Sequence, residues 1–332
     1  MGDFAENYQF VIQDEIQGFH WNKQSCTLHP IVLYYMKDNK LMETSLCFIS
    51  DDLNHDNCFV YEVMKQTVHY IKDEIFTTLS MVHYFSDGCA GQYKNYKNFI
   101  NLCLHEKDFN VKCEWSFFAT SHGKSPCDGL GGTLKRLTAR ASLQRTHSHP
   151  ILTAKQVFEY CNEEVKGAHV IFISAEEMVP IRSMLETRYS TATTLPGTRG
   201  FHHFTPLSES VMAAKRVSED ELYALEFNLV LGKTNLVKLA DPNMSDFIVC
   251  SYDEKLWVGL VDVVDKEHDD VQVKFMHPSY PARSFFWPRK DDVCFVPIMN
   301  VVCIIEAPVT VTGRQYKLSD KDISTIEQAL AE

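Results

Sequence analysis

Three aspartates in this 332-residue chain have the residue type and the setting for metal-dependent chemistry. Asp3 lies in "DFAENY", Asp87 in "YFSDGCAGQYKN" and Asp128 in "CDGLGG". Carboxylates supply both negative charge and the hard oxygen ligands that Mg²⁺ prefers. Two such ions, about 3.5–4 Å apart, activate an attacking hydroxyl and stabilise the leaving oxygen during in-line displacement at a phosphodiester. If folding brings the three acids together, phosphodiester chemistry is the reaction that they indicate.

Each aspartate also has an ordinary structural interpretation. Asp87 precedes a glycine, and Asp-Gly is a strong turn signal. Asp128 is placed to cap the start of a helix, and an acid as close to a chain terminus as Asp3 is usually just exposed. For Asp87 the metal role is favoured, because an apolar strand precedes it and "GQYKN" follows it. The acids that compete with Asp3 are Glu6, Asp14 and Glu15.

The charge distribution restricts how this chain would bind nucleic acid. Its net charge of −12 excludes coating by bulk electrostatics, because that mode needs a basic surface. Between Gly88 and Arg145, however, nine Lys and Arg residues face four acidic ones, so a nucleic-acid site would be local. A plain surface loop and a solvated helix face are the alternatives. The side chains predicted to contact nucleic acid in this stretch are His122, Lys124, Lys135, Arg136 and Arg140.

Apolar periodicity predicts alternating strands and helices over the first 190 residues. The strands are expected over 3–13, 26–36, 41–50, 81–85, 112–119 and 168–174. The helices are expected near 60–71, 92–104, 128–143, 153–165 and 175–188. This order is that of an α/β ribonuclease H-like fold, a mixed sheet with flanking helices. Such a fold brings the middle of the first strand beside the end of the fourth, so acids remote in sequence would converge.

The C-terminal part has a different pattern. Five short strands separated by turns between 246 and 305 predict a small all-β barrel of the SH3-like or Tudor-like kind. The predicted domains are the core at 1–190, a linker or arm with a helix at 191–240, the barrel at 241–310 and a C-terminal helix at 311–332. Aromatic residues of the barrel either form a cage or fill its core, and the core is favoured. They are Tyr252, Trp257, Phe275, Phe286 and Trp287.

The remaining metal-binding residue types show no recognisable site. Eleven cysteines are scattered without a CxxC pair, which indicates reduced and mostly buried thiols. The acids Asp51, Asp52 and Asp56 around His55 are interpreted as a loop followed by a helix cap. No apolar run is long enough to span a membrane. The histidines interpreted as surface or arm residues are His147, His149, His202 and His203.

Several motifs together resemble those of a known family. They are "DFAENY", "YFSDGCAGQYKN", "FFATSHGKSPCDGLGGTLKR" and the late pair "VKFMHP" and "FFWP". Over most of its length the chain is similar to transposon-derived proteins of animal genomes, which resemble transposases with a DDE/DDD catalytic core. This resemblance implies that Asp3, Asp87 and Asp128 bind Mg²⁺ or Mn²⁺ as a catalytic triad, with His122 and Lys124 near the phosphate. It also implies a first strand that extends further back and an upstream DNA-end-binding module, so a truncated core is expected.

These observations lead to two functional hypotheses. The first is a transposase-like DNA-processing protein, nuclear or shared between cytoplasm and nucleus, that carries out metal-dependent phosphodiester hydrolysis or strand transfer. The second is a domesticated, catalytically inactive protein that binds nucleic acid or chromatin through its basic helix and its barrel. DNA is the expected partner, with a protein or chromatin partner at the acidic barrel and no membrane. Self-association is left open.

Overall fold

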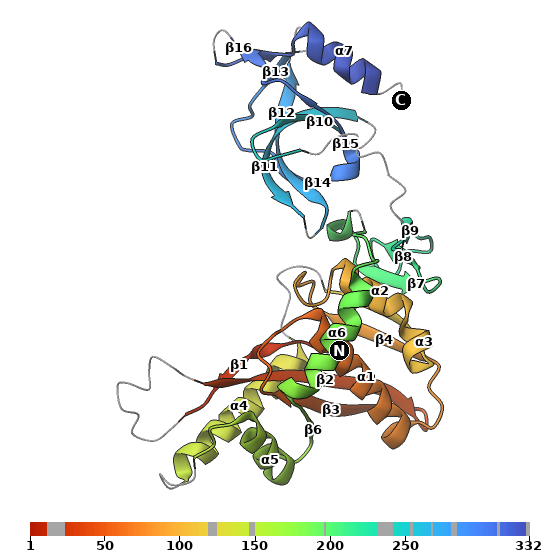
Figure 1. The fold of residues 1–332 in the computed structure, drawn as a ribbon, viewed down its shortest axis with the longest axis vertical. Coiled ribbons are helices and arrows are strands. Elements are labelled where there is room, and N and C mark those ends of the chain that lie inside the picture. The colour runs from red at the N-terminus through yellow and green to blue at the C-terminus, as the bar shows by residue number, and fades with distance from the viewer. Residues whose placement is uncertain are drawn as a thin grey trace. The chain divides into compact units, whose positions relative to one another are not determined.

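The structure, a computed structural model, has two compact units and describes ten stretches of the chain. Met1–Ala192 and His202–Val230 form the first unit, and Thr193–Phe201 and Leu231–Glu332 form the second, so the chain passes between the units three times. The first unit is a mixed α/β structure with two sheets, and the second is a curled antiparallel half-barrel (Figure 1). The described residues are 1–11, 24–118, 125–145, 150–195, 197–230, 242–252, 255–266, 268–279, 284–310 and 313–329.

The first sheet has the order β1-β2-β3-β6. Pairing is antiparallel between β1 and β2 and between β2 and β3, whereas β6 runs parallel to β3. The predicted meander of three strands is therefore confirmed over its described residues. The strand bounds are β1 Ala5–Gln9, β2 Ser25–Lys37, β3 Lys40–Ser50 and β6 His169–Ile173.

The second sheet has the order β4-β5-β7-β8-β9. Strands β4 and β5 are parallel, as expected for strands joined by helices, and the other pairs are antiparallel. Strands β7 to β9 were not predicted, because each has only four or five residues and the sequence around them lacks clear periodicity. The bounds are β4 Met81–Ser86, β5 Lys112–Phe117, β7 His203–Pro206, β8 Val211–Lys215 and β9 Leu225–Asn228.

Helices bury both faces of β3. Leu46 and Phe48 belong to a core with residues of α1 and α6, whereas Cys47 and Ile49 belong to a core with residues of α4 and α5. Because successive strand residues point to opposite faces, one apolar run serves both cores. A π-helical turn, η2 Ile71–Ile75, continues α1. The helix bounds are α1 Asn57–Tyr70, α2 Tyr96–Cys103, α3 His105–Phe109, α4 Pro126–Gln144, α5 Ala154–Glu164 and α6 Ala175–Tyr189.

Helix α2 begins later than predicted. The sequence pattern places its start at Gln92, but the helix begins at Tyr96, because the Asn95 side chain accepts hydrogen bonds from the backbone N–H groups of Lys97 and Asn98. Residues 88–95 form the turn that follows β4 instead. This turn, which begins next to Asp87, is part of the candidate site described below.

The half-barrel of the second unit is built from antiparallel strands. Its order is β15-β10-β11-β12-β13-β17-β16, and β14 also pairs with β12. The last predicted strand is divided into β14 and β15 by a 3-10 turn, η4 Ile298–Asn300, and a helix, α7 Asp320–Ala329, follows. The strand bounds are β10 Phe247–Tyr252, β11 Lys255–Asp265, β12 Asp270–Ser279, β13 Ser284–Phe286, β14 Val293–Pro297, β15 Val301–Ile305, β16 Val309–Thr310 and β17 Tyr316–Lys317.

The half-barrel buries both faces of its central strands. Val261 and Val273 belong to the inner core, whereas Val258 and Met276 belong to a second cluster. Ile326 of α7 packs against that second cluster. The C-terminal helix therefore covers part of the outer face of the strands.

The segment Thr193–Phe201 belongs to the half-barrel although residues on both sides of it belong to the first unit. It includes a 3-10 turn, η3 Thr198–Gly200. The Arg199 guanidinium forms an ion pair with Asp265, lies 3.5 Å from the Asp270 carboxylate and stands 3.9 Å from the centre of the Phe295 ring. The pKa of Asp270 is raised to about 6 because the carboxylate is buried, and the positive charge of Arg199 opposes this rise.

The close approach of β11 to β12 generates a stability prediction. A Cβ atom at Gly259 would lie 2.4 Å from Val273 Cγ1 and 2.7 Å from the Lys274 carbonyl oxygen. Because that oxygen is backbone, Gly259→Ala should lower the free energy of unfolding of the half-barrel by about 2–3 kcal/mol. Urea unfolding followed by circular dichroism measures this loss. Gly200→Ala is the control, because no atom lies within 4 Å of its added methyl group. Equal stability of the two variants would contradict the proposed packing constraint.

Candidate functional site

The start of the chain joins the two sheets of the first unit. The backbone N–H of Gly2 donates to the Phe85 carbonyl of β4 at 2.9 Å. On the other side, the N–H of Val32 in β2 donates to the Met1 carbonyl at 2.9 Å, and the N–H of Asp3 donates to Pro30 at 3.3 Å. Asp3 is therefore held between β2 and the carboxyl end of β4.

Asp87 lies at that same end of β4, which terminates at Ser86. Its Oδ1 accepts a hydrogen bond from the Cys89 backbone N–H at 3.1 Å, and the Ser86 hydroxyl donates to its carbonyl at 2.8 Å. The turn interpretation of Asp87 is thus correct. A second role for Asp87 is compatible with this turn. Phe85, two residues before Asp87, accepts a hydrogen bond from Gly2, the residue before Asp3, so the two aspartates lie near each other.

Asp128 lies in the first turn of α4. Its Oδ2 accepts from the Ser125 backbone N–H at 2.8 Å. Asp128 therefore helps to cap α4, but the N-cap residue is Ser125 and not Asp128, which is the third residue of the helix. The same turn touches the start of the chain, since the Cys127 thiol donates to the Met1 carbonyl at 3.5 Å. Three elements that are far apart in sequence therefore bring Asp3, Asp87 and Asp128 into one region.

The electrostatics of Asp3 reflect this arrangement. The pKa of Asp3 is raised to about 7, mainly by burial and in addition by the negative charges of Asp87 and Asp128. A hydrogen bond from the Phe4 backbone N–H acts in the opposite direction. In the described part of the chain, no group of three or more His, Cys, Asp and Glu side chains is arranged so that it would hold a metal ion. As they stand, the three acids are electrostatically coupled but are not a formed metal centre.

The residues predicted to contact nucleic acid differ in whether the structure describes them and in how exposed they are. His122 and Lys124 lie outside the described residues. Lys135 is half-buried on α4, whereas Arg136 and Arg140 are exposed one turn apart on the same helix that begins beside Asp128. The structure thus presents two cations along the helix that carries one of the acids.

The three glycines after Asp128 differ in the space that a side chain would have. A Cβ at Gly131 would lie 3.1 Å from the Ala5 Cβ and 3.6 Å from Pro30 Cγ, so packing against β1 and β2 requires a small residue. At Gly129 and Gly132 an added Cβ would meet no atom of the described residues within 4 Å. Both are exposed and weaken the helix by about 1 kcal/mol each relative to alanine. Packing against the described part of the chain does not explain them.

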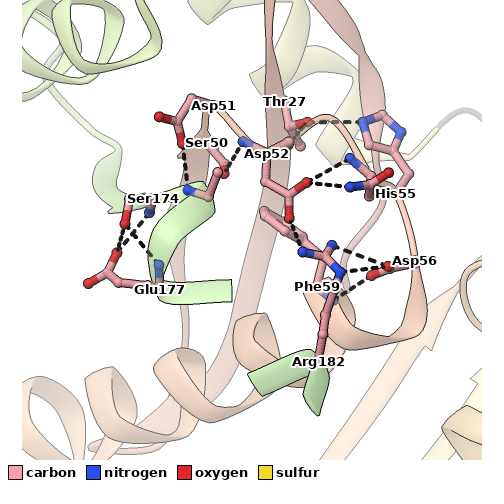
Figure 2. Close-up of polar contacts among 12 residues, drawn as sticks. Thr27, Ser50, Asp51, Asp52, His55, Asp56, Phe59, Ser174, Glu177 and Arg182 are labelled. Carbon is pink, nitrogen blue, oxygen red and sulfur yellow. Dashed lines mark hydrogen bonds and ion pairs between the residues drawn. The ribbon is translucent and has the colours of Figure 1, made fainter. Parts of the chain in front are cut away.

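The acidic cluster around His55 is structural, as the sequence indicated (Figure 2). Asp56 caps α1 by accepting from the Phe59 N–H at 2.9 Å. Asp52 is buried, and its Oδ2 lies 2.6 Å from Arg182 Nη1, while Arg182 also bonds Asp56 at 3.2 Å. His55 bonds Thr27. One arginine of α6 thus ties together the loop after β3 and the start of α1, and no sequence signal indicated it.

The four histidines predicted to lie at the surface or in the arm have different environments. His147 and His149 lie outside the described residues. His203 is buried, in contrast to its predicted exposure, because Nδ1 bonds the Ser116 hydroxyl at 2.8 Å across two paired strands. His202 remains half-buried.

In the half-barrel, only one of the predicted aromatic residues is fully buried. Phe275 lies in the core, as predicted, while Trp257 and Trp287 are half-buried and Phe286 is exposed. The ring of Trp257 lies 6.1 Å from that of His277, which lies 5.9 Å from Phe286. The side chain of Tyr252 is not described.

A buried pair beneath the acids was missed at the sequence level. His29 Nε2 lies 2.9 Å from the Tyr93 hydroxyl, and Phe4, next to Asp3, packs edge-on against the His29 ring at 4.4 Å. Tyr93 belongs to the turn after Asp87, so the pair joins that turn to β2. The sequence signal that could have indicated this pair is the position of His29 within the apolar run "CTLHPIVL", where a buried histidine needs a hydrogen-bond partner.

Comparison with known proteins gives a family but no activity. A family model described as Domain of unknown function (DUF8701) matches residues 1–218, which is about two thirds of the chain. The chain belongs to the DUF8701 family. The DUF8701 match includes Asp3, Asp87, Asp128 and all of α4, and it ends before the strands of the half-barrel begin. No curated protein and no solved structure matches the chain.

Within the described stretches, no helix combines the length and the apolar character that crossing a membrane requires.

The raised pKa of Asp3 predicts a pH-dependent effect of its removal. Between about pH 4 and pH 7 the unfolded state loses this proton while the folded state keeps it, so the stability of the folded state falls as the pH rises. Asp3→Asn should therefore raise the free energy of unfolding by about 2 kcal/mol at pH 8 and by almost nothing at pH 4. The gain at pH 8 is smaller than the free energy that corresponds to the whole pKa shift, because the site is partly open to solvent. Urea titrations at both pH values measure this, with exposed Asp73→Asn as control. The same gain at both pH values would rule out the electrostatic cause.

The α4 glycines give a matched stability prediction. Gly131→Ala should lower the free energy of unfolding by about 1 kcal/mol, because its methyl group presses on Ala5. Gly132→Ala should raise it by about 0.5–1 kcal/mol, since only the helix propensity changes. Urea midpoints of the two variants measure both effects. Changes of the same sign would show that the contact with β1 does not decide the choice of glycine.

Proposed function

We propose that this chain is a transposase-like DNA-processing protein with an Asp3, Asp87 and Asp128 site. The observation that carries the proposal is the electrostatic coupling of Asp3 to both other acids, which come from three separate elements of the fold. Raised pKa values caused by burial and by neighbouring acids are typical of functional carboxylates. The resemblance of the motifs around the three aspartates supports the same interpretation.

The strand connections support a ribonuclease H-like core within the mixed α/β unit. Antiparallel pairing gives the order β3, β2, β1, and the hydrogen bond from Gly2 to Phe85 continues it to β4 and the parallel β5. Helices α1 and α2 fall between strands as this fold requires, and α4 follows β5. In this interpretation β6 is an addition at one edge, and β7 to β9 are an addition at the other.

The half-barrel supports the second part of the fold proposal. Five of its strands follow the order β15, β10, β11, β12, β14. A 3-10 turn separates β14 from β15. A curled five-stranded antiparallel sheet with this connectivity is consistent with an SH3-like or Tudor-like barrel. The half-buried Trp257 and the exposed Phe286 would suit a protein or chromatin partner.

The acids fit a divalent metal ion by their chemistry. Asp3, Asp87 and Asp128 would hold Mg²⁺ or Mn²⁺ through hard oxygen ligands, and each carboxylate keeps a second oxygen when the first caps a turn. The repulsion that raises the Asp3 pKa is the kind that a bound cation relieves. When bound, such ions activate a hydroxyl and stabilise the leaving oxygen at a phosphodiester.

The chain itself would position the DNA. Arg136 and Arg140, on the exposed face of α4, would contact backbone phosphates next to the acids. The open surface at Gly129 and Gly132 would let a phosphate backbone approach the helix closely. DNA processing would place the protein in the nucleus.

The second candidate is a non-enzymatic protein that binds DNA or chromatin. Two observations favour it: the Asp128 carboxylate already caps α4, and the described acids do not form a metal centre as they stand. This protein would use the same basic helix face and the same half-barrel.

A nicking assay distinguishes the two candidates. Supercoiled DNA incubated with the full chain and Mg²⁺ or Mn²⁺ should be nicked, and EDTA should abolish nicking. Asp87→Asn keeps the acceptor for the Cys89 N–H but removes the charge, so it should slow nicking about 100-fold or more. Asp73→Asn, an exposed acid elsewhere in the first unit, should cleave like the wild-type chain.

Failure of this assay has a defined meaning. If the wild-type chain does not cleave, or Asp87→Asn cleaves equally well, the catalytic proposal is wrong. The non-enzymatic candidate then requires DNA binding that weakens with salt. In that case Arg136→Gln should reduce the slope of log affinity against log salt by about one.

A further inference from the structure

A small cavity lies inside the first unit next to the start of the chain. Its volume is about 50 Å³. Met1 and Gly2 border it, together with residues of β2, α1 and β4 and the rings of Tyr93 and Trp115. A space of this size has room for about three water molecules.

Two buried polar atoms of the cavity lining have no hydrogen-bond partner among the described residues. They are His29 Nδ1 and Thr67 Oγ1, and the side chains that carry them are 2% and 1% exposed. The other buried polar groups of the lining are satisfied, since Tyr84 bonds His105 at 2.9 Å and Trp115 Nε1 donates to Ser86 at 3.0 Å. Unsatisfied buried polar atoms are rare and usually indicate a bound water or ion.

The His29 ring is not free to find another partner. Its Nε2 lies 2.9 Å from the Tyr93 hydroxyl, and the Phe4 ring packs nearly perpendicular to it, with 4.4 Å between the ring centres. A Cβ atom at Gly2 would lie only 3.3 Å from its Cε1. Burial lowers the pKa of His29 to about 3, so the ring is neutral at physiological pH and has one donor and one acceptor nitrogen.

We propose that this cavity is a water-binding site in which ordered water links His29 Nδ1 to Thr67 Oγ1. The water completes the hydrogen bonding of both side chains and fixes the tautomer and the orientation of the His29 ring. Through the bond to Tyr93, the ring in turn positions the turn that follows Asp87. The site does not depend on metal binding or on catalysis.

Crystals of the full chain test the site directly. A high-resolution map should show water 2.7–3.2 Å from His29 Nδ1. The same crystals under xenon pressure should not take up xenon at this position, because xenon enters dry apolar cavities. Xenon in the cavity, or no water there when other buried waters are visible, would overturn the proposal.

A second measurement tests the link between the two side chains in solution. Thr67→Val keeps the shape but removes the hydroxyl, and should shift the ¹⁵N resonances of the His29 ring. Thr67→Ser keeps the hydroxyl and should leave those resonances near their wild-type positions. If Thr67→Val folds and the His29 resonances do not move, the two side chains share no water. If it does not fold, the xenon experiment on the wild-type chain still decides the question.

Discussion

The first unit depends on a few backbone hydrogen bonds at the start of the chain. Residues 1–3 bond β2 on one side and β4 on the other, and they are the described backbone link between two sheets that otherwise have separate strand orders. Asp3 is fixed by this link, and Asp87 follows the strand that accepts one of the bonds. Helix α4 adds the third acid, because Cys127 in its first turn bonds Met1 and Gly131 packs against Ala5. The backbone bonds of residues 1–3 therefore hold Asp3 near the end of β4, where Asp87 follows.

Much of the first unit could be predicted from apolar periodicity. The pattern over 41–50 predicted a strand, and β3 is present there, with Leu46 to Ile49 buried on both faces. Strands β7 to β9 could not be predicted, because Pro206 and the alanines of "VMAAK" carry weak strand propensity. Their pairing with β5 is decided by tertiary contacts. The start of α2 was placed four residues early, since periodicity does not show which residue provides the cap.

The candidate site was predictable only in part. The turn chemistry of Asp87 can be read from its neighbours and is present in the structure. A capping role of Asp128 could also be predicted, but the N-cap is Ser125, three residues before it. The mutual influence of the three carboxylates could not be predicted from the sequence, because it arises from elements far apart in sequence. The same limit explains why Arg182 and the His29–Tyr93 pair were missed: their partners lie on other elements.

The path of the chain between the two units has a practical consequence. Because Thr193–Phe201 belongs to the half-barrel, neither unit is one continuous segment of sequence. A fragment that began at residue 231 would lack Arg199, leaving the buried Asp270 without the cation that faces it and the Phe295 ring uncovered. The half-barrel would therefore have to be produced with residues 193–201 supplied, for example by circular permutation or as a separate peptide. Proteolysis at a single point would also not release it from the rest of the chain.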